Sequence, residues 1–438
     1  MLQLILYAVI SPVLWPVAKI ILLLLPKMRT RFFSEARLRK VALAKLKENR
    51  GEKKVLIFHA ASAGEFEQLK PLLLKVNRTG FFVFQTFSSP TIFEKERESD
   101  LFDAACYHPE DSILWAFYFF AKIKPSAYIV NRHDLWPAHI LCASMMKIKT
   151  VFINANFYEK SLRFRLPLRS ANRAVFELFD LILCGSKRIR DNILNLAPGA
   201  KVSITGDSRF DQVALRKGKN RKNHFGSKTD ILNRRNIVLG SIIPSDYDVI
   251  LTGLREFLDK KNTSEPKYRI IAVPHEVAPK DISGFIKCVE KHGFTHTRHS
   301  ESGKIDDCDI VIIDSVGILA ELYCYAYTAY VGAGFGAGVH SAIEPAVYGV
   351  PVFFGPNYHI LDEAVRMVQE GIARVVHTDN EVTEFLGEID NTETHGSVSK
   401  DTLDFVAQNT SSSVSILNHI ETLVSSGVQT LLSRSALN

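Results

Sequence analysis

Two blocks of short apolar runs that alternate with helix-length amphipathic segments constrain the fold of this chain more than any other feature. In the first block the strand-length runs are residues 55–60, 81–87, 127–130, 150–154, 180–184 and 202–205. In the second block they are residues 237–240, 268–273, 309–314, 328–331, 352–354 and 373–376. This alternation predicts βαβ units, in which helices cover both faces of a parallel sheet. We therefore predict an α/β protein with two doubly wound, Rossmann-like domains and a cleft between them, with ligands at the carboxyl ends of the strands.

A polar stretch at residues 216–236 separates the two blocks. It holds eight Lys or Arg with Asn, Gly and Ser and few apolar residues, which is typical of a solvated linker. The predicted organisation is an N-terminal membrane anchor at 1–26, a basic juxtamembrane segment at 27–54, an N-terminal domain at 55–215, the linker at 216–236, a C-terminal domain at 237–400 and a C-terminal helical segment at 401–438.

The N-terminus combines an apolar stretch with a basic one. Residues 1–26 carry one charge, Lys19, and would span about 39 Å as a helix at ~1.5 Å per residue, kinked by Pro12 and Pro16. Residues 27–54 follow with eleven Lys or Arg against three Glu, which places the remainder in the cytoplasm and would attract anionic lipids. A secretory signal peptide would need a basic segment before the apolar stretch, and a buried core helix is the other alternative. We expect a membrane anchor or an interfacial helix.

Composition and missing motifs exclude several function classes. The net charge of +7 arises in the basic segment, so the rest is close to neutral and no nucleic-acid partner is expected. Six scattered cysteines without a C-x-x-C pair fit a reducing compartment, with neither a disulfide framework nor a zinc site. No P-loop, dinucleotide or H-E-x-x-H motif and no Asp-rich metal signature is present, so no cofactor and no metal is implied.

The glycine-rich loop in residues 331–356 (VGAGFGAGVHSAIEPAVYGVPVFFGP) is the clearest candidate for a ligand site. Glycines let a ligand approach the backbone, and the short helix predicted at 341–347 would offer unpaired N–H groups to an anion. A flexible turn is the alternative, although the nearby His340 and Glu344 favour a phosphate- or carboxylate-binding loop. Three more strand ends in this block are polar, and they carry Ser241, His275 and the group Asp314, Ser315 and Gly317, in which Ser315 is a predicted helix N-cap.

In the first block, residues 58–65 (FHAASAGE) join a strand to a helix. Gly64 would permit an unusual backbone angle in this turn. Glu65 is expected in the first helical turn, where the helix dipole would keep its carboxylate ionised and available as a general base. An ordinary capping glutamate is the alternative.

Two further strand ends of the first block carry polar side chains. Arg132, His133 and Asp134 form one group, which predicts an acid–base or anion-binding role or, alternatively, salt bridges within the loop. Asn154 and Asn156 form the other group, and their amides could hydrogen-bond a sugar.

Taken in order, these loops resemble the Kdo (3-deoxy-D-manno-oct-2-ulosonic acid) transferases of lipopolysaccharide synthesis. The resemblance runs from the anchor to about Val376, and the matching positions are His59-Ala60-Ala61-Ser62, Gly64-Glu65, Leu135-Trp136-Pro137, Asn154-Ala155, Gly206, Phe210-Asp211, Gly240-Ser241, Pro274-His275, Asp314, Gly317, His340, Glu344-Pro345-Ala346, Gly349, Pro351-Val352 and Phe354-Gly355-Pro356. It implies a GT-B fold with an N-terminal acceptor-binding domain and a C-terminal nucleotide-sugar-binding domain. It also implies an inverting transfer of Kdo from CMP-Kdo to a lipid A precursor (lipid IVA) at the cytoplasmic face of the bacterial inner membrane, without a metal.

The resemblance assigns roles to individual residues. Glu65 would be the base that removes a proton from the acceptor hydroxyl, with Asp134, His133 and Arg132 as candidates for a second acid or transition-state group. The acceptor-side loop would contain Ser62, Gly64, Asn154 and Asn156. The donor would be held by Ser241, His275, Asp314, Ser315, Gly317, Gly336, Gly338, His340 and Glu344, including the loop amides near Gly336 and Gly338.

Three positions depart from the family pattern. Arg132-His133-Asp134 stands where Glu-x-Glu is usual, Ile318 replaces a usual Glu, and Asn156 replaces a usual Arg. Two alternatives therefore stay open. One is a GT-B glycosyltransferase that uses another nucleotide sugar on a membrane lipid, and the other is a degenerate, non-catalytic homologue.

Overall fold

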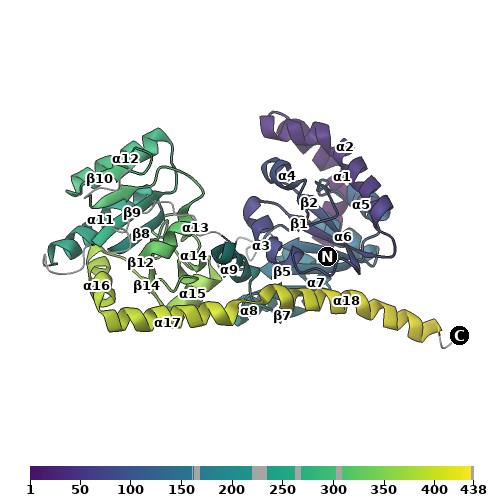
Figure 1. The fold of residues 1–438 in the computed structure, drawn as a ribbon. Helices are drawn as coiled ribbons and strands as arrows, with labels where there is room; N and C mark the ends of the chain where they lie inside the picture. The colour runs from purple at the N-terminus through teal and green to yellow at the C-terminus, as the bar shows by residue number, and fades with distance from the viewer. Residues whose placement is uncertain (160, 162–167, 220–233, 262–267, 302–307, 436–438) are drawn as a thin grey trace. The chain divides into compact units, whose positions relative to one another are not determined.

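The computed structural model describes residues 1–159, 161, 168–219, 234–261, 268–301 and 308–435, and it divides into two compact units. Unit 1 is Met1–Gln212 with Thr410–Asn438, and unit 2 is Val213–Asn409. Each unit contains a seven-stranded parallel sheet flanked by helices (Figure 1). The predicted α/β class with two doubly wound domains is confirmed.

The sheet of unit 1 has the strand order β3-β2-β1-β4-β5-β6-β7. Its strands are β1 (Lys54–Ala60), β2 (Phe81–Phe87), β3 (Ala104–Tyr107), β4 (Ala127–Asn131), β5 (Lys149–Ala155), β6 (Leu181–Cys184) and β7 (Val202–Ile204). The order reverses between β1 and β4, so the loops after these two strands diverge at the position where doubly wound sheets bind ligands.

The helices of unit 1 cover both faces of this sheet. They are α1 (Leu2–Leu22), α2 (Pro26–Asn49), α3 (Ala63–Leu73), α4 (Pro90–Glu96), α5 (Ile113–Ile123), α6 (Pro137–Met145), α7 (Leu168–Leu178), α8 (Lys187–Leu196), α9 (Ser208–Lys219), which runs into unit 2, and α18 (Ser412–Ser435). Successive residues of β1 alternate between two apolar clusters, with Val55 and Ile57 in one and Leu56 and Phe58 in the other. Because both faces are buried, the central strands are apolar at nearly every position.

The sheet of unit 2 has the strand order β10-β11-β9-β8-β12-β13-β14. Its strands are β8 (Arg235–Ile242), β9 (Tyr268–Pro274), β10 (His296–Arg298), β11 (Ile310–Ile312), β12 (Ala326–Val331), β13 (Val352–Phe354) and β14 (Ala373–Val375). Its helices are α11 (Pro244–Asp259), α12 (Pro279–Lys291), α13 (Leu319–Leu322), the 3-10 turn η2 (Tyr323–Tyr325), α14 (Ile343–Ala346), α15 (Asp362–Gln369), α16 (Asp379–Asp390) and α17 (Thr392–Asn409). The four polar strand ends singled out in the sequence follow β11, β9, β8 and β12, which are adjacent in this sheet.

Several segment boundaries in the structure differ from those predicted from the sequence. The predicted anchor and basic segment are part of unit 1, because α1 packs against α5, α6 and α7 while α2 packs against β3, α4 and α5. The predicted linker at 216–236 begins inside α9 and ends inside β8, and its middle, 220–233, lies outside the described residues. The predicted C-terminal segment at 401–438 is divided, because α17 belongs to unit 2 whereas α18 packs against α3 and β5 of unit 1.

Candidate active site

Glu65 lies in the first turn of α3, directly after β1. Ser62 is the N-cap, and its side-chain oxygen accepts a hydrogen bond from the Glu65 N–H at 3.3 Å. The Glu65 carboxylate turns back towards the start of the helix, where Oε2 accepts a hydrogen bond from the Ala61 N–H at 2.7 Å. This backbone contact fixes the carboxylate at the carboxyl edge of the sheet.

Burial raises the pKa of Glu65 to about 7, and the residue is only 8% exposed. The nearby charge of Asp134 adds to the rise, whereas the Ala61 hydrogen bond and the charge of Arg132 oppose it. The expectation that the helix dipole keeps this carboxylate ionised is therefore wrong, because desolvation outweighs the groups that favour the charged form. A carboxyl group with a pKa near 7 is well matched to accept a proton at neutral pH.

Gly64 does not use the unusual backbone angle that a glycine permits. It lies inside α3 without a positive φ, and a Cβ atom added there would meet nothing within 4 Å. Gly64 and Ser62 are both exposed, so this turn presents a small and open surface beside Glu65.

Asp134 brings a second carboxyl group to the same strand ends. Its Oδ2 accepts hydrogen bonds from His59 Nε2 at 2.6 Å and from Trp136 Nε1 at 2.7 Å. Burial lowers the pKa of His59 although Asp134 opposes this shift, and Nδ1 on the other side of the ring lies 2.9 Å from Thr86 Oγ1. These contacts tie the loop after β4 to β1, close enough for Asp134 to influence Glu65.

The other two members of that loop have different surroundings. Arg132 Nη1 lies 3.9 Å from Asp207 Oδ2, and its charge also reaches Glu65. His133 is exposed, and its backbone N–H donates to Asn131 O at 2.9 Å. Geometry thus favours Asp134 and Arg132 over His133 as partners of Glu65.

A network of hydrogen bonds made by buried asparagine side chains supports these loops. Asn131 Nδ2 donates to Glu65 O at 2.9 Å, and its Oδ1 accepts from Asn154 Nδ2 at 2.8 Å. The Asn154 Oδ1 in turn accepts from the N–H of Ser208 at 3.0 Å. Asn154 is thus a supporting residue beneath the site, since it is 1% exposed, and Asn156 is also buried just after β5.

Four residues other than glycine adopt left-handed backbone angles at strand ends. They are Arg132 (φ 58°), Asn154 (φ 51°), Ser241 (φ 54°) and Ala333 (φ 70°). Each such residue costs about 1–3 kcal/mol and persists only where the surrounding structure enforces it. Strain of this kind gathers at functional sites, and here it marks the ends of β4, β5, β8 and β12.

The glycine loop of unit 2 uses its glycines in two ways. Gly332 and Gly334 permit close backbone packing, since Cβ atoms there would lie 2.3 Å from Ser241 O and 2.4 Å from Gly355 N. Gly336 is exposed and Gly338 adopts a φ of 126°. Because the N–H groups of Gly336 and Gly338 both donate to Ala333 O at 3.0 Å, they are already used inside the loop, and their contribution to donor binding stays a prediction.

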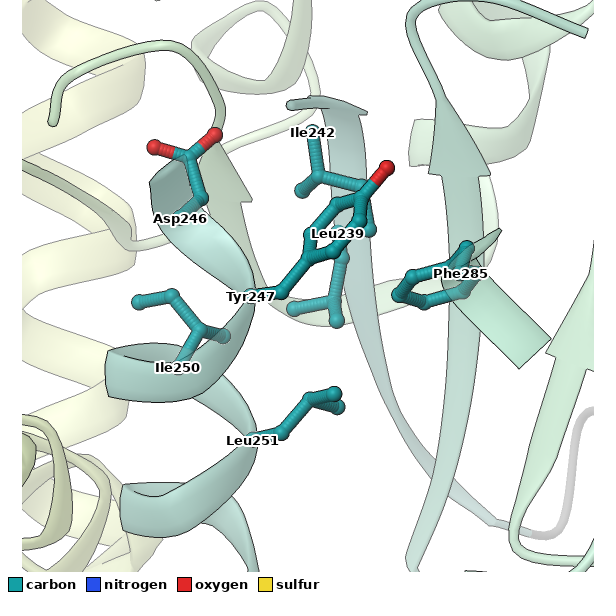
Figure 2. Close-up of a pocket in the computed structure, with 7 residues that line it drawn as sticks. All are labelled: Leu239, Ile242, Asp246, Tyr247, Ile250, Leu251 and Phe285. Atoms are coloured by element: carbon teal, nitrogen blue, oxygen red, sulfur yellow. The ribbon is translucent and has the colours of Figure 1, made fainter. Parts of the chain in front are cut away.

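Asp246 holds the glycine loop in place. This fully buried carboxylate accepts hydrogen bonds from the backbone N–H groups of Ile243 (2.9 Å), Ala333 (2.8 Å) and Phe335 (3.3 Å) and from Tyr330 Oη (3.0 Å). Figure 2 shows Asp246 in the first turn of α11, with its carboxylate directed away from the apolar pocket beneath it. Besides Asp246, the residues that line this pocket are Leu239, Ile242, Tyr247, Ile250, Leu251 and Phe285.

Two histidines meet beside the glycine loop. The rings of His275 and His340 stack with centroids 4.7 Å apart and an interplanar angle of 19°. Burial lowers the pKa of His340, and the charge of His275 acts in the same direction. Within the described part of the chain, the buried His340 Nε2 has no hydrogen-bond partner.

The remaining donor-side candidates are less closely grouped. Glu344 lies in the single-turn helix α14, where burial raises its pKa while Arg216, at 4.0 Å, opposes the rise. Asp314 accepts a hydrogen bond from the Ser300 N–H at 3.1 Å. Ser315 and Gly317 are exposed in the loop after β11. The expectation that Ser315 is a helix N-cap is wrong, because α13 begins only at Leu319, after a turn that Gly317 allows through a φ of 91°.

Among the described residues, one group could share a metal ion, namely Asp248, Cys288 and His292 on α11 and α12. Asp248 Oδ1 already accepts a hydrogen bond from Lys291 Nζ at 3.0 Å. The group lies outside the loops that follow the strands, so it adds no chemistry to them.

Comparison with known proteins agrees with this arrangement. Residues 33–212, within unit 1, match the family model for 3-deoxy-D-manno-octulosonic-acid transferase (kdotransferase). The enzyme of that name from Aquifex aeolicus is 28% identical over 342 residues, which cover 77% of this chain and 86% of that protein. The one from Chlamydia muridarum is 27% identical over 348 residues, which cover 74% of this chain and 76% of that protein. The chain is thus similar to the Kdo transferases over about three quarters of its length. These likenesses support a glycosyltransferase.

Solved structures of low sequence identity support the fold. A UDP-GlcNAc 2-epimerase from Neisseria meningitidis, bound to UDP-GlcNAc, matches 87% of this chain and its own full length with a TM-score of 0.58 at 17% identity. A glycosyltransferase from Rickettsia africae matches 85% of this chain and 98% of its own length with a TM-score of 0.58 at 10% identity. These likenesses concern the two-domain GT-B fold alone.

Sequence analysis missed several residues that shape the site. Asp246 is the most important of them, and Pro244-Ser245-Asp246 directly after β8 carries a helix-start pattern, with Pro in the first position and an acid in the third. Asn131 and Gln68 were also overlooked, because their amides bond groups from distant segments, as in the hydrogen bond that Gln68 Nε2 donates to Asp207 Oδ1 at 2.7 Å. No local pattern marks such residues.

Proposed function

We propose that this chain is an inverting glycosyltransferase that moves Kdo from CMP-Kdo to a lipid A precursor (lipid IVA) in lipopolysaccharide core biosynthesis. One observation carries the proposal. It is the buried Glu65, held by the Ala61 N–H with a pKa of about 7, after the carboxyl end of β1 in a chain that resembles the Kdo transferases. The proposed location is the cytoplasmic face of the bacterial inner membrane, which the apolar α1 and the basic α2 support.

In the proposed reaction Glu65, in its ionised form, accepts the proton of the acceptor hydroxyl. The hydroxyl oxygen forms a bond to the anomeric carbon of Kdo from the side opposite the phosphate. The bond from that carbon to the phosphate oxygen breaks, its electron pair leaves with CMP, and the configuration inverts. Asp134 and Arg132 act on Glu65 through their charges, and the acceptor-side turn with Ser62 and Gly64 leaves space for the sugar.

In unit 2 the proposed donor site consists of the loops after β8, β9 and β12. The unpartnered His340 Nε2 and the stacked ring of His275 would contact the nucleotide, and the glycine loop held by Asp246 would shape the phosphate side. Ser241, with its left-handed backbone, and Glu344 are the other proposed donor contacts. No step in this scheme requires a metal or another cofactor.

The test is transfer by the purified full-length protein. Mixed with CMP-Kdo and tetraacylated lipid A precursor, it should yield a glycolipid heavier by Kdo in mass spectrometry. Glu65→Gln should abolish the product, whereas Glu67→Gln should not, because Glu67 lies on the same helix but pairs with Lys70 at 2.7 Å. Normal turnover by Glu65→Gln would remove Glu65 from the mechanism.

Ligand binding separates this proposal from its two alternatives, which the departures at Arg132 and Ile318 motivate. Thermal stabilisation by CMP but not by UDP is expected. Stabilisation by UDP alone would favour a glycosyltransferase that uses another nucleotide sugar. Absence of any response to nucleotides would favour a non-catalytic homologue.

A further inference from the structure

Polar contacts hold the apolar helix α1 against unit 1. Tyr7 Oη donates a hydrogen bond to Asp111 Oδ2 at 2.8 Å. The buried Ser11 Oγ accepts one from the Ile113 N–H at 3.2 Å, at the first residue of α5. The N-terminal half of α1 therefore lies along the protein surface and is attached to the start of α5.

The one charge of α1 faces the protein as well. Lys19 Nζ donates to Glu110 at 2.9 Å and also to Glu35 on α2. Both carboxylates are buried, so the ammonium group is neutralised on the protein side of the helix. A spanning arrangement would break these pairs and move the ammonium group towards the hydrocarbon core, which is unfavourable for a charge.

The opposite side of α1 is apolar and exposed. Leu6, Val13 and Ile20, which are seven residues apart, are 56%, 69% and 69% exposed. By length and composition, α1 is the one helix among those described that could cross a membrane, so composition alone does not distinguish spanning from lying flat.

The neighbouring helix α5 has an exposed apolar side too. Leu114, Trp115, Phe117 and Tyr118 are all exposed although α5 packs against α1, α2 and α6. Exposed apolar side chains that gather on neighbouring helices are typical of a membrane or partner contact. We call these exposed residues of α1 and α5 together the apolar face.

Cations border the apolar face. Arg39 lies over the Trp115 ring at 6.0 Å, and Lys122 lies over the Tyr118 ring at 5.7 Å. The exposed basic residues of α2 include Arg37, Lys40 and Lys45. Aromatic rings beside cations are typical of the head-group level of a membrane, and basic side chains complement anionic lipids.

We propose that α1 does not cross the bilayer but lies flat in the head-group region of an anionic membrane, with the apolar face of α1 and α5 inserted together. This deepens the membrane location given in the proposed function. It also assigns α5 a lipid contact, and it keeps α3 with Glu65 in the unit that touches the membrane surface.

Depth measurements along α1 test this arrangement. In full-length protein with Cys288, Cys308 and Cys324 replaced by serine, a nitroxide is attached to one added cysteine, from Leu6→Cys, Val13→Cys, Ile20→Cys or Phe117→Cys. On phosphatidylethanolamine–phosphatidylglycerol vesicles, power-saturation EPR should place all four labels at similar depth, about 5–10 Å into the boundary between head groups and acyl chains. A Leu403→Cys label on α17 of unit 2 should stay in water and is the control.

Other profiles would overturn the proposal. A spanning helix would place Val13→Cys about 10 Å deeper than Leu6→Cys and Ile20→Cys, at ~1.5 Å per residue, with Phe117→Cys in water. The protein could instead form a dimer without lipid, shield the labels in that dimer and fail to bind vesicles. That result would mean that a second copy covers the apolar face. A spanning profile in an active transferase would defeat this inference alone, whereas equal depths in a protein without Kdo transfer would defeat the proposed function alone.

Discussion

The protonation state of Glu65 determines when the proposed base can act. Since burial raises its pKa to about 7, half of the enzyme is protonated at neutral pH and cannot accept a proton. We expect kcat/KM to rise with pH across about 7 with the slope of a single ionisation. Steady-state rates between pH 5.5 and 8.5 at substrate concentrations below KM measure this, and a kcat/KM that is flat between pH 6 and 8 would contradict it.

The same burial makes Glu65 a source of instability at alkaline pH. Between about pH 4.5 and 7 the native state keeps a proton that the unfolded chain releases, so the free energy of unfolding falls as the pH rises through this window. Glu65→Gln keeps an acceptor for the Ala61 N–H without the charge. We expect it to be more stable than the original protein at pH 8, by about 1–3 kcal/mol, and close to it at pH 4.5.

Chemical denaturation of both proteins at the two pH values measures this difference. Glu67→Gln is the control, since its carboxylate is paired with Lys70 near the surface and should change stability by less than about 1 kcal/mol. A Glu65→Gln protein that is less stable at pH 8 would show that the carboxylate stabilises the native state.

Asp246 should affect the donor without touching it. Asp246→Asn places an amide NH₂ against backbone N–H groups that now donate to a carboxylate, and losing such a bond costs about 1.5–3 kcal/mol. We expect a KM for CMP-Kdo raised about tenfold or more, with the acceptor KM unchanged. Asp248→Asn, two residues further on and exposed, should leave both constants unchanged, and equal effects of the two variants would refute this role.

At the residue scale, the sequence could place Glu65 because strand, turn and helix are contiguous there. It could not predict the pKa, because desolvation and the charge of Asp134 come from the separate loop after β4. Asp246 was missed for a related reason, since the loop that it holds is more than eighty residues away in the chain.

At the scale of elements, the glycine loop depends on the close packing of one backbone segment against another. A Cβ atom on Gly334 would lie 2.4 Å from Gly355 N and 2.6 Å from its Cα, so the loop or its neighbour has to move. We expect Gly334→Ala to raise the KM for CMP-Kdo at least tenfold and to lower the melting temperature. Enzyme kinetics and calorimetry measure the two effects.

Gly387→Ala in α16 is the matched control. A Cβ atom at this position meets nothing within 4 Å, and alanine favours a helix by about 1 kcal/mol over glycine. The control should therefore keep its activity and gain stability. A fully active Gly334→Ala would mean that the loop tolerates displacement and does not fix the donor.

The elements themselves were largely predictable. Strands such as β2 and β13 begin and end where the apolar runs do, because buried parallel strands need apolar residues at nearly every position. The strands β3 and β10 were missed, since β3 (AACY) begins with two alanines, which are depleted in strands, and β10 (HTR) has no apolar residue.

At the scale of the whole molecule, the C-terminal helix α18 completes unit 1 after the chain has passed through unit 2. Asp211 accepts hydrogen bonds from the N–H groups of Ser411 at 2.9 Å and Ser413 at 3.0 Å, which fixes the start of α18. Ile416 and Ile420 are fully buried in the cluster that also contains Phe66 of α3. The helix that carries Glu65 therefore depends on the last segment of the chain.

Removing a buried side chain from α18 should weaken unit 1 alone. Ile420→Ala leaves a cavity beneath α3, and such changes cost about 2–5 kcal/mol. We expect the unfolding transition of unit 1 to move to lower temperature while that of unit 2 stays in place. Differential scanning calorimetry of the full chain follows both transitions, and CMP identifies the one that belongs to unit 2 by raising it.

Val414→Ala is the control on the same helix. Val414 is 42% exposed, so its truncation removes little buried surface and should leave both transitions within the error of measurement. Equal shifts of the two transitions in Ile420→Ala would mean that the units unfold as one cooperative body. In that case α18 would couple the unfolding of unit 1 to that of unit 2, rather than stabilise unit 1 alone.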